Sequence, residues 1–222
     1  MWTPADIPNI VDWWRVDDGV LVAGAVENWV GYLNGIVLTQ ANGALQPMLT
    51  ADQINGQPAL VFDGTDEYLQ GAFTEIEQPN TIIIVCSEPT DTGAARVMYD
   101  GREITKRHTL FENGATSTYR LLGTPGVSQN TNQAIGVAGT FRIWSTIFRG
   151  ATSVFRVNGT TKTIAGALGA SGLTGLTLGS KQNGTQSADT KITDVLVVNG
   201  AMTVTQFEIT KTYLNVLRRG IY

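Results

Sequence analysis

The sequence predicts an all-β fold, a sandwich or a barrel, that ends in one C-terminal helix. Asn-Gly or Asp-Gly occurs ten times in the 222 residues, beginning at residues 18, 34, 42, 55, 63, 100, 113, 158, 183 and 199. These dipeptides favour the positive φ angles of tight hairpin turns. Short runs rich in Val, Ile, Thr and aromatic residues lie between them, a spacing typical of all-β proteins. Helical spacing of apolar residues is found only near the C-terminus.

Two of the predicted strands are particularly informative. In "SVFRVNGTTKTI", Phe155 and Val157 share one face and the turn falls at Asn158-Gly159, so this segment predicts a hairpin. In "FRIWSTIFRG" both faces are apolar, which indicates a central strand. The full set of predicted strands is Ala59 to Phe62, Thr81 to Cys86, Arg96 to Tyr99, Tyr119 to Leu122, Arg142 to Phe148, Val154 to Val157 and Lys191 to Val198.

The C-terminal segment "MTVTQFEITKTYLNVLRRG" predicts a helix docked on the sandwich. Thr203 and Gln206 have the spacing of a capping box. Apolar residues recur at helical spacing, and Gly220 can end the helix after two arginines that suit the negative end of its dipole. The apolar set is Val204, Phe207, Leu214 and Leu217.

The length of the chain indicates one domain, residues 1–222, and its composition excludes some classes of protein. The net charge is −4 and only 15% of residues are charged, so we expect no nucleic acid partner. The single cysteine, Cys86, cannot form an internal disulfide. We find neither an apolar run long enough for a membrane span nor a cleaved signal peptide, and we expect a soluble protein.

Several segments together resemble the concanavalin A-like lectin/laminin-G-like jelly roll. They include "VENWVGYLNGIVLTQ", "INGQPALVFDGTDEYLQ", "LTLGS" and "KITDVLVVNGAMTVTQFEITKTYL". The resemblance implies a jelly-roll sandwich of two antiparallel sheets, a module found in bacterial surface proteins and in bacteriophage virion proteins. One position departs from the pattern, because Gly31 stands where an Asp often follows Trp29 by two residues. The matching positions are Trp29, Gly35, Gln40, Pro47, Asn55-Gly56, Pro58, Phe62-Asp63-Gly64, Tyr68-Leu69, Asn158-Gly159, Gly179, Asp194, Asn199 and Tyr213-Leu214.

An acidic cluster in "FDGTDEYL" is a candidate metal site. Asp63, Asp66 and Glu67 could supply oxygen ligands to calcium. The alternative is a hydrogen-bonded loop in which Asp63 caps its own turn, and no EF-hand spacing supports a metal. We therefore favour the turn, and we expect no cofactor.

Paired acids also raise the question of glycoside hydrolysis. Some relatives of this fold place catalytic acids on alternate residues of a strand, as Glu-x-Asp-x-x-Glu. The nearest match here, "TEIEQPN", offers Glu75 and Glu77 but reaches Pro79 without a third acid. We therefore predict that the chain is not an enzyme.

Basic and aromatic residues supply the candidate binding sites. "GREITKRH" holds the basic cluster, Arg102, Lys106 and Arg107, beside the single histidine, His108. The cluster is either a solvated edge or a contact for an acidic partner. Three aromatic residues could offer a platform for a sugar or a protein interface, unless the fold covers them: Trp13, Trp14 and Tyr119.

From these patterns we predict a non-catalytic module on a bacteriophage virion surface, either a head decoration or a fibre-like protein. It would contact other virion proteins and its own copies as a homo-oligomer. The alternative is a lectin-like adhesion module that binds a cell-surface glycan in an extracellular or cell-surface setting. A glycoside hydrolase is the third reading.

Overall fold

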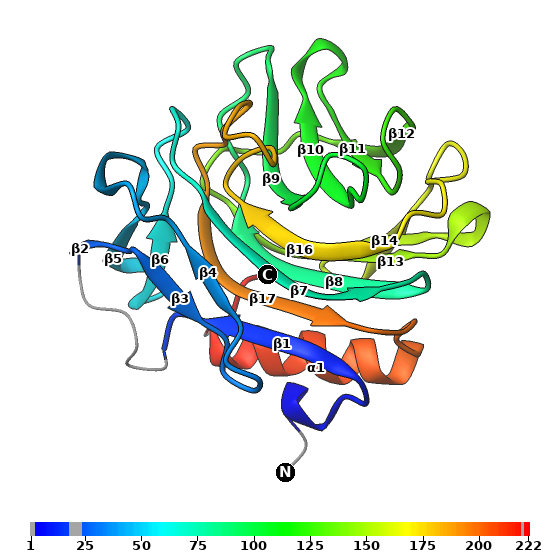
Figure 1. Cartoon of the computed structure of the whole chain (residues 1–222), viewed down its shortest axis with the longest axis horizontal. Coiled ribbons are helices and arrows are strands. Elements are labelled where there is room, and N and C mark those ends of the chain that lie inside the picture. Colours follow the sequence, from blue (N-terminus) through cyan, green and yellow to red (C-terminus); the bar gives the residue numbers. More distant parts are fainter. Residues whose placement is uncertain (1–2, 18–23, 219) are drawn as a thin grey trace.

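The computed structural model, which describes residues 3–17, 24–218 and 220–222, consists of two antiparallel β-sheets and a C-terminal helix (Figure 1). Sheet A has nine strands, in the order β15 (Thr160–Lys162), β14 (Val154–Val157), β13 (Phe141–Phe148), β8 (Asn80–Ser87), β17 (Lys191–Val198), β6 (Gln57–Val61), β5 (Met48–Ile54) and β2 (Gly24–Ala25), with β1 (Ile10–Arg15) paired to β17. Sheet B has eight, in the order β12 (Ser128–Ala134), β11 (Thr118–Leu122), β10 (Thr109–Asn113), β9 (Ala95–Gly101), β16 (Leu173–Leu178), β7 (Leu69–Ile76), β4 (Val37–Thr39) and β3 (Asn28–Val30).

Helix α1 (Val204–Leu217) adds a third layer on sheet A, and it runs alongside β1 and β17 in Figure 1. Among the described residues, a short 3₁₀ helix, η1 (Pro4–Asp6), precedes β1, and three more join strands: η2 (Gly43–Leu45), η3 (Gly114–Thr116) and η4 (Gly150–Thr152). No helix among the described residues is both long and apolar enough to cross a membrane.

Two apolar cores account for the layers. The larger core lies between the sheets, and the smaller lies between sheet A and α1. The central strand β8 serves both, because Ile82 and Ile84 belong to the first core while Ile83 and Val85 belong to the second. Alternation along a strand sends successive side chains to opposite faces, so a strand covered on both sides is apolar throughout.

The same alternation confirms the central strand predicted at residues 142–148. Trp144 and Phe148 of β13 enter the core between the sheets, whereas Phe141 and Ile143 face α1. Its neighbours on either side are β8 and β14.

The predicted hairpins are confirmed where both turn residues have positive φ angles. Asn158 and Gly159, which join β14 to β15, have φ angles of 50° and 88°, as a type I′ turn requires. Asn55 and Gly56, which join β5 to β6, also both have positive φ angles, 48° and 81°. The prediction is wrong at Asn42-Gly43, where the Asn42 side chain instead accepts a hydrogen bond from the Ala44 amide and caps η2. Asp18-Gly19 lies outside the described residues.

The predicted capping box is confirmed at the start of α1. The Thr203 hydroxyl accepts a hydrogen bond from the Gln206 amide, and the Gln206 side chain accepts one from the Thr203 amide. These two bonds satisfy donors that the first turn of a helix otherwise leaves unpaired.

Candidate functional site

The two tryptophans are buried, so of the two readings that the sequence leaves open the fold covers both rings, and neither is an exposed platform. Trp13 is 1% exposed and packs edge-on against Tyr213 of α1, while its indole donates to Asp194. Trp14 is fully buried in the core between the sheets and donates to the Ile36 carbonyl. The two rings do occupy opposite faces of β1, but each face is covered by another layer.

Tyr119 is also buried and cannot act as an exposed contact. Its ring lies 4.6 Å from that of Trp144, between the two sheets. Burial raises the pKa of the Tyr119 hydroxyl well above its usual value. The residue therefore belongs to the core.

The acidic cluster forms the hydrogen-bonded turn that the sequence favours over a calcium site. Asp63 Oδ1 accepts a hydrogen bond from the Thr65 amide at 2.7 Å, and Glu67 Oε2 accepts one from the Asp63 amide at 2.7 Å. The carboxylates of Asp63 and Glu67 are thus used by the backbone of their own loop. In the part of the chain that the structure describes, no three His, Cys, Asp or Glu side chains, with Asp66 included, gather as metal ligands.

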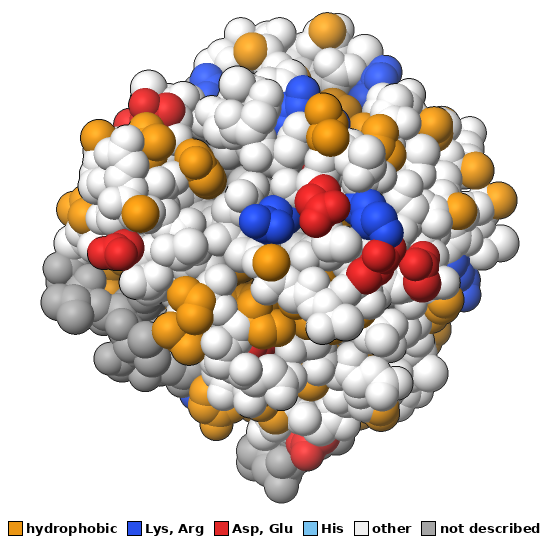
Figure 2. Space-filling view, in the orientation of Figure 1, with side chains coloured by type: hydrophobic (Ala, Val, Ile, Leu, Met, Phe, Trp, Pro, Cys, Tyr) orange, Lys and Arg blue, Asp and Glu red, His pale blue; other side chains and the backbone are white. Residues whose placement is uncertain are grey.

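The predicted basic cluster separates into paired surface residues and one residue of a pocket. Lys106 pairs with Glu75, and Arg102 lies 4.0 Å from Glu103. The face in Figure 2 accordingly shows acidic and basic side chains next to one another near its centre. Neither Arg102 nor Lys106 therefore presents an uncompensated charge to an acidic partner. Arg107 is held differently.

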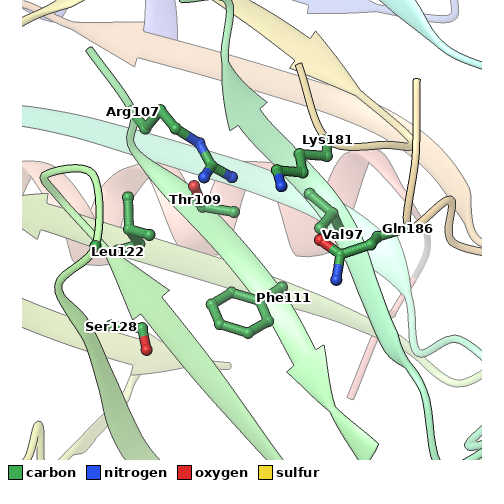
Figure 3. A pocket seen from close by; sticks show the side chains of 9 residues that line it. Val97, Arg107, Thr109, Phe111, Leu122, Ser128, Lys181 and Gln186 are labelled. Atoms are coloured by element: carbon green, nitrogen blue, oxygen red, sulfur yellow. The ribbon is translucent and has the colours of Figure 1, made fainter. Parts of the chain in front are cut away.

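A pocket of about 280 Å³ lies on the face of sheet B that is turned away from the core (Figure 3). Alternation in the strands explains which side chains reach it. Leu110 and Leu121 point into the core, so their neighbours Phe111 and Leu122 point outward. A loop after β16 closes one side. The lining residues are Val97, Arg107, Thr109, Phe111, Leu122, Gly126, Ser128, Lys181 and Gln186.

The guanidinium of Arg107 is fixed at the edge of this pocket by Asp100. Its Nε lies 3.0 Å from both carboxylate oxygens, and its Nη2 lies 2.7 Å from Oδ2. Asp100 is fully buried and also accepts hydrogen bonds from the Thr109 hydroxyl and the Gln182 amide. A bidentate pair of this kind orients a guanidinium as well as stabilising it.

Lys181 and Phe111 give the pocket its two contrasting sides. Figure 3 shows the nitrogen ends of Arg107 and Lys181 turned toward the middle of the pocket, with the Phe111 ring farther along the strand. Among the described residues, none pairs with the Lys181 ammonium group. The hydroxyls of Thr109 and Ser128 and the amide of Gln186 add hydrogen-bonding groups.

Sequence reasoning identified Arg107 but missed the rest of this site. Phe111 was not singled out, although its position one residue after a core leucine is the signal that could have placed it outward. Lys181 and Gln186 carry no such signal, because they reach the pocket from a loop some seventy residues along the chain.

His108 is part of the scaffold rather than of the site. Its ring stacks on Phe148 at 4.0 Å, and Nε2 lies 2.9 Å from the Ser171 carbonyl oxygen. Burial lowers the pKa of His108 to about 4, so the imidazole is neutral at pH 7.

Comparisons with known proteins identify the fold. No family model matches the chain, and no curated protein matches it. Among solved structures, Trypanosoma rangeli sialidase aligns with a TM-score of 0.65 and 10% identity over 97% of this chain and 34% of that chain. The ligand binding domain of botulinum neurotoxin serotype D, in complex with N-acetylneuraminic acid, aligns with a TM-score of 0.66 and 7% identity over 92% and 50%.

A third match is the binding domain of botulinum neurotoxin DC in complex with rat synaptotagmin II, with a TM-score of 0.65 and 8% identity over 93% of this chain and 52% of that chain. The chain thus spans between a third and about half of these structures. At such low identity the likeness concerns the fold. The chain is a concanavalin A-like jelly-roll sandwich, as its sequence predicts.

Proposed function

We propose that the chain is a non-catalytic, lectin-like module that binds a glycan in the pocket on sheet B. The observation that carries this proposal is the lining of the pocket. An aromatic ring, Phe111, stands beside side chains that can hydrogen-bond to hydroxyl groups. Sugar rings combine apolar faces with hydroxyl edges, and sites of this kind suit them.

The structural neighbours support a sugar as the ligand. One match is Trypanosoma rangeli sialidase in complex with sialic acid, and another is the botulinum neurotoxin serotype D domain in complex with N-acetylneuraminic acid. Residues cannot be transferred from either protein at 7–10% identity. The neighbours therefore suggest which sugars to test first, and the contacts must come from this chain's own side chains.

The composition of the pocket supports binding without hydrolysis. Glycosidases that use two acids hold them roughly 5–9.5 Å apart across the scissile bond. None of the nine residues that line this pocket is Asp or Glu. Glu75, one of the two acids considered from the sequence, is paired with Lys106.

Replacing Phe111 by Ala tests the proposal. We expect the variant to lose glycan binding by about fivefold or more, because stacking on an aromatic face contributes on the order of 1 kcal/mol. A glycan array followed by calorimetry on the best ligand measures the effect. Tyr222→Ala is the control, since Tyr222 is 55% exposed and does not line the pocket. Equal affinity of wild type and Phe111→Ala would contradict this site.

The predicted role on a bacteriophage virion surface, with other virion proteins as partners, stays a prediction that competes with this proposal. A virion subunit would bind no glycan on the array and would copurify with assembled particles. The extracellular or cell-surface setting is the corresponding expectation for the glycan-binding module.

A further inference from the structure

We propose that the pocket on sheet B recognises an acidic sugar through its carboxylate group, which Arg107 and Lys181 bind together. The inference rests on the proposed function and deepens it, because it assigns a class of glycan and the residues that select it. Three features of the described residues support it: the free edge of Arg107, the local charge and the apolar side of the pocket.

The first feature is the edge of the guanidinium that Asp100 leaves free. Asp100 occupies the edge formed by Nε and Nη2. No described residue accepts a hydrogen bond from Nη1, so the end of the group formed by Nη1 and Nη2 is available. A guanidinium presents five N–H donors in a planar fork, and this end suits a second carboxylate. Asp100 is thus a positioning residue, since it fixes the direction in which Arg107 donates.

The second feature is the local charge. Arg107 and Lys181 both line the pocket, and Arg120 lies beside it, because Arg120 pairs across strands with Phe111 and its Nη1 lies 3.3 Å from the Ser128 hydroxyl. Arg120 Nε is buried without a hydrogen-bond partner. Three cationic side chains therefore lie at or beside the pocket, and Asp100, which pairs with Arg107, balances one of them. The chain as a whole has a net charge of −4. A local positive excess in an acidic protein favours an anionic ligand.

The third feature is the part of the pocket that the charges do not occupy. Phe111 offers an apolar face, while Gln186 and Ser128 offer an amide and a hydroxyl. A bare anion would leave these groups unused. A sugar that carries a carboxylate on its ring would use both sides, with the carboxylate against Arg107 and Lys181 and the ring or its substituents against Phe111.

Calorimetry with four trisaccharide or disaccharide probes tests the inference on the whole chain. The probes are 3′-sialyllactose, its methyl ester, lactose and lactose 3′-sulfate. We expect 3′-sialyllactose to bind and the ester and lactose to bind about tenfold more weakly or not at all, because each lacks the charge-assisted hydrogen bonds. Lactose 3′-sulfate carries an anion of different shape, and we expect it to bind more weakly than the carboxylate.

Variants assign the effect to the named residues. Lys181→Gln should weaken binding of 3′-sialyllactose about tenfold without changing the melting temperature. Arg107→Lys keeps the charge but removes the fork, so it should also weaken binding; because it loses the bidentate pair to the buried Asp100, its melting temperature should fall as well, and Lys181→Gln carries the assignment. Lys191→Gln is the matched control, because it changes the net charge equally at a residue that does not line this pocket. Thermal melts separate loss of binding from loss of folding.

The outcomes distinguish the inference from the proposed function. If lactose binds as well as 3′-sialyllactose, and Lys181→Gln has no effect, the module binds glycans but the assignment of a carboxylate is wrong. Equal binding of lactose 3′-sulfate overturns the selectivity for a carboxylate. If no probe binds and the glycan array is also silent, both proposals fail.

Discussion

At the scale of single residues, Asp12 explains why glycine occupies position 31. The Asp12 side chain is fully buried and accepts hydrogen bonds from the amides of Leu33 at 2.9 Å and Ile36 at 2.9 Å. A Cβ atom at residue 31 would fall on this carboxylate. The glycine two residues after Trp29, where the chain departs from the pattern that it resembles, therefore has a physical cause: β1 supplies a carboxylate to this loop, and any side chain at position 31 would collide with it.

Glu112 is a second residue whose environment has a measurable consequence. Its side chain is buried on the core side of β10, and neither of its oxygens has a hydrogen-bond partner among the described residues. Burial, reinforced by the nearby Asp91, raises the pKa of Glu112 from 4.5 to about 8. The folded state therefore holds this proton more tightly than the unfolded state does.

The sign of the effect on stability follows from this shift. The raised pKa of Glu112 stabilises the folded state fully below pH 4.5, and this stabilisation is lost as the pH rises toward about 8. We expect Glu112→Gln, which stays neutral, to flatten the decline in melting temperature across this range. His108 acts in the opposite direction, since its pKa is lowered to about 4 and its contribution is lost as the pH falls below 6.5.

Melting curves at half-unit steps from pH 4 to pH 9 measure the loss of stability at high pH, assigned to Glu112, and the loss at low pH, assigned to His108. Glu27→Gln is the control, because Glu27 is exposed. The interpretation of Glu112 is wrong if wild type and Glu112→Gln decline in parallel above pH 5.

At the scale of elements, the end of α1 is held to sheet A by a buried ion-pair network. Arg218 is fully buried, and its Nε lies 2.7 Å from Asp194 Oδ2 while its Nη1 lies 2.7 Å from Asp17 Oδ1. Asn55, in the turn between β5 and β6, donates to the Arg218 carbonyl at 3.1 Å. Side chains from β17, from the turn after β1 and from the turn between β5 and β6 therefore hold the end of the helix.

Removing Arg218 tests how strongly this network holds the helix. We expect Arg218→Ala to lower the free energy of unfolding by about 3–5 kcal/mol, because Asp194 would be left buried without its partner. Lys211→Ala removes an ion pair to the half-exposed Glu208 on the same helix, and it should cost less than about 1 kcal/mol. Urea denaturation followed by circular dichroism compares the two variants. Similar losses in both would show that burial of the Arg218 network contributes little.

At the scale of the whole molecule, three layers decide which aromatic residues are accessible. Sheet B, sheet A and α1 enclose two cores, so Trp13 and Trp14 are each covered from a different side. The face of sheet B turned away from the core has no further layer over the pocket, which leaves Phe111, Arg107 and Lys181 accessible. Recognition is therefore expected there.

Self-association is a prediction about the whole molecule, made from the sequence. We expect the sedimentation coefficient to rise with concentration if the chain associates with its own copies. Analytical ultracentrifugation over a hundredfold range of concentration measures this. Phe111→Ala should sediment like the wild type, because the pocket is assigned to a glycan. A single monomeric species at every concentration would contradict the prediction.

The sequence by itself determined the features that depend on neighbours along the chain. The Asn158-Gly159 hairpin and the capping box at Thr203 are local, and the alternation of strand residues correctly placed Phe155 and Val157 on one face, where both lie in the core. Turn geometry, helix capping and the two-residue period of a strand all act over a few residues, so their signals are contained in short segments.

Only the tertiary structure decided which faces are covered and which charges meet. Trp13 is buried because α1, some two hundred residues away, packs over it, and Arg218 at the end of the helix meets Asp17 from the start of the chain. Lys181 completes the pocket from a distant loop. Alternation says that two side chains point to opposite faces, but it cannot say what lies over each face, since that depends on how remote segments pack together.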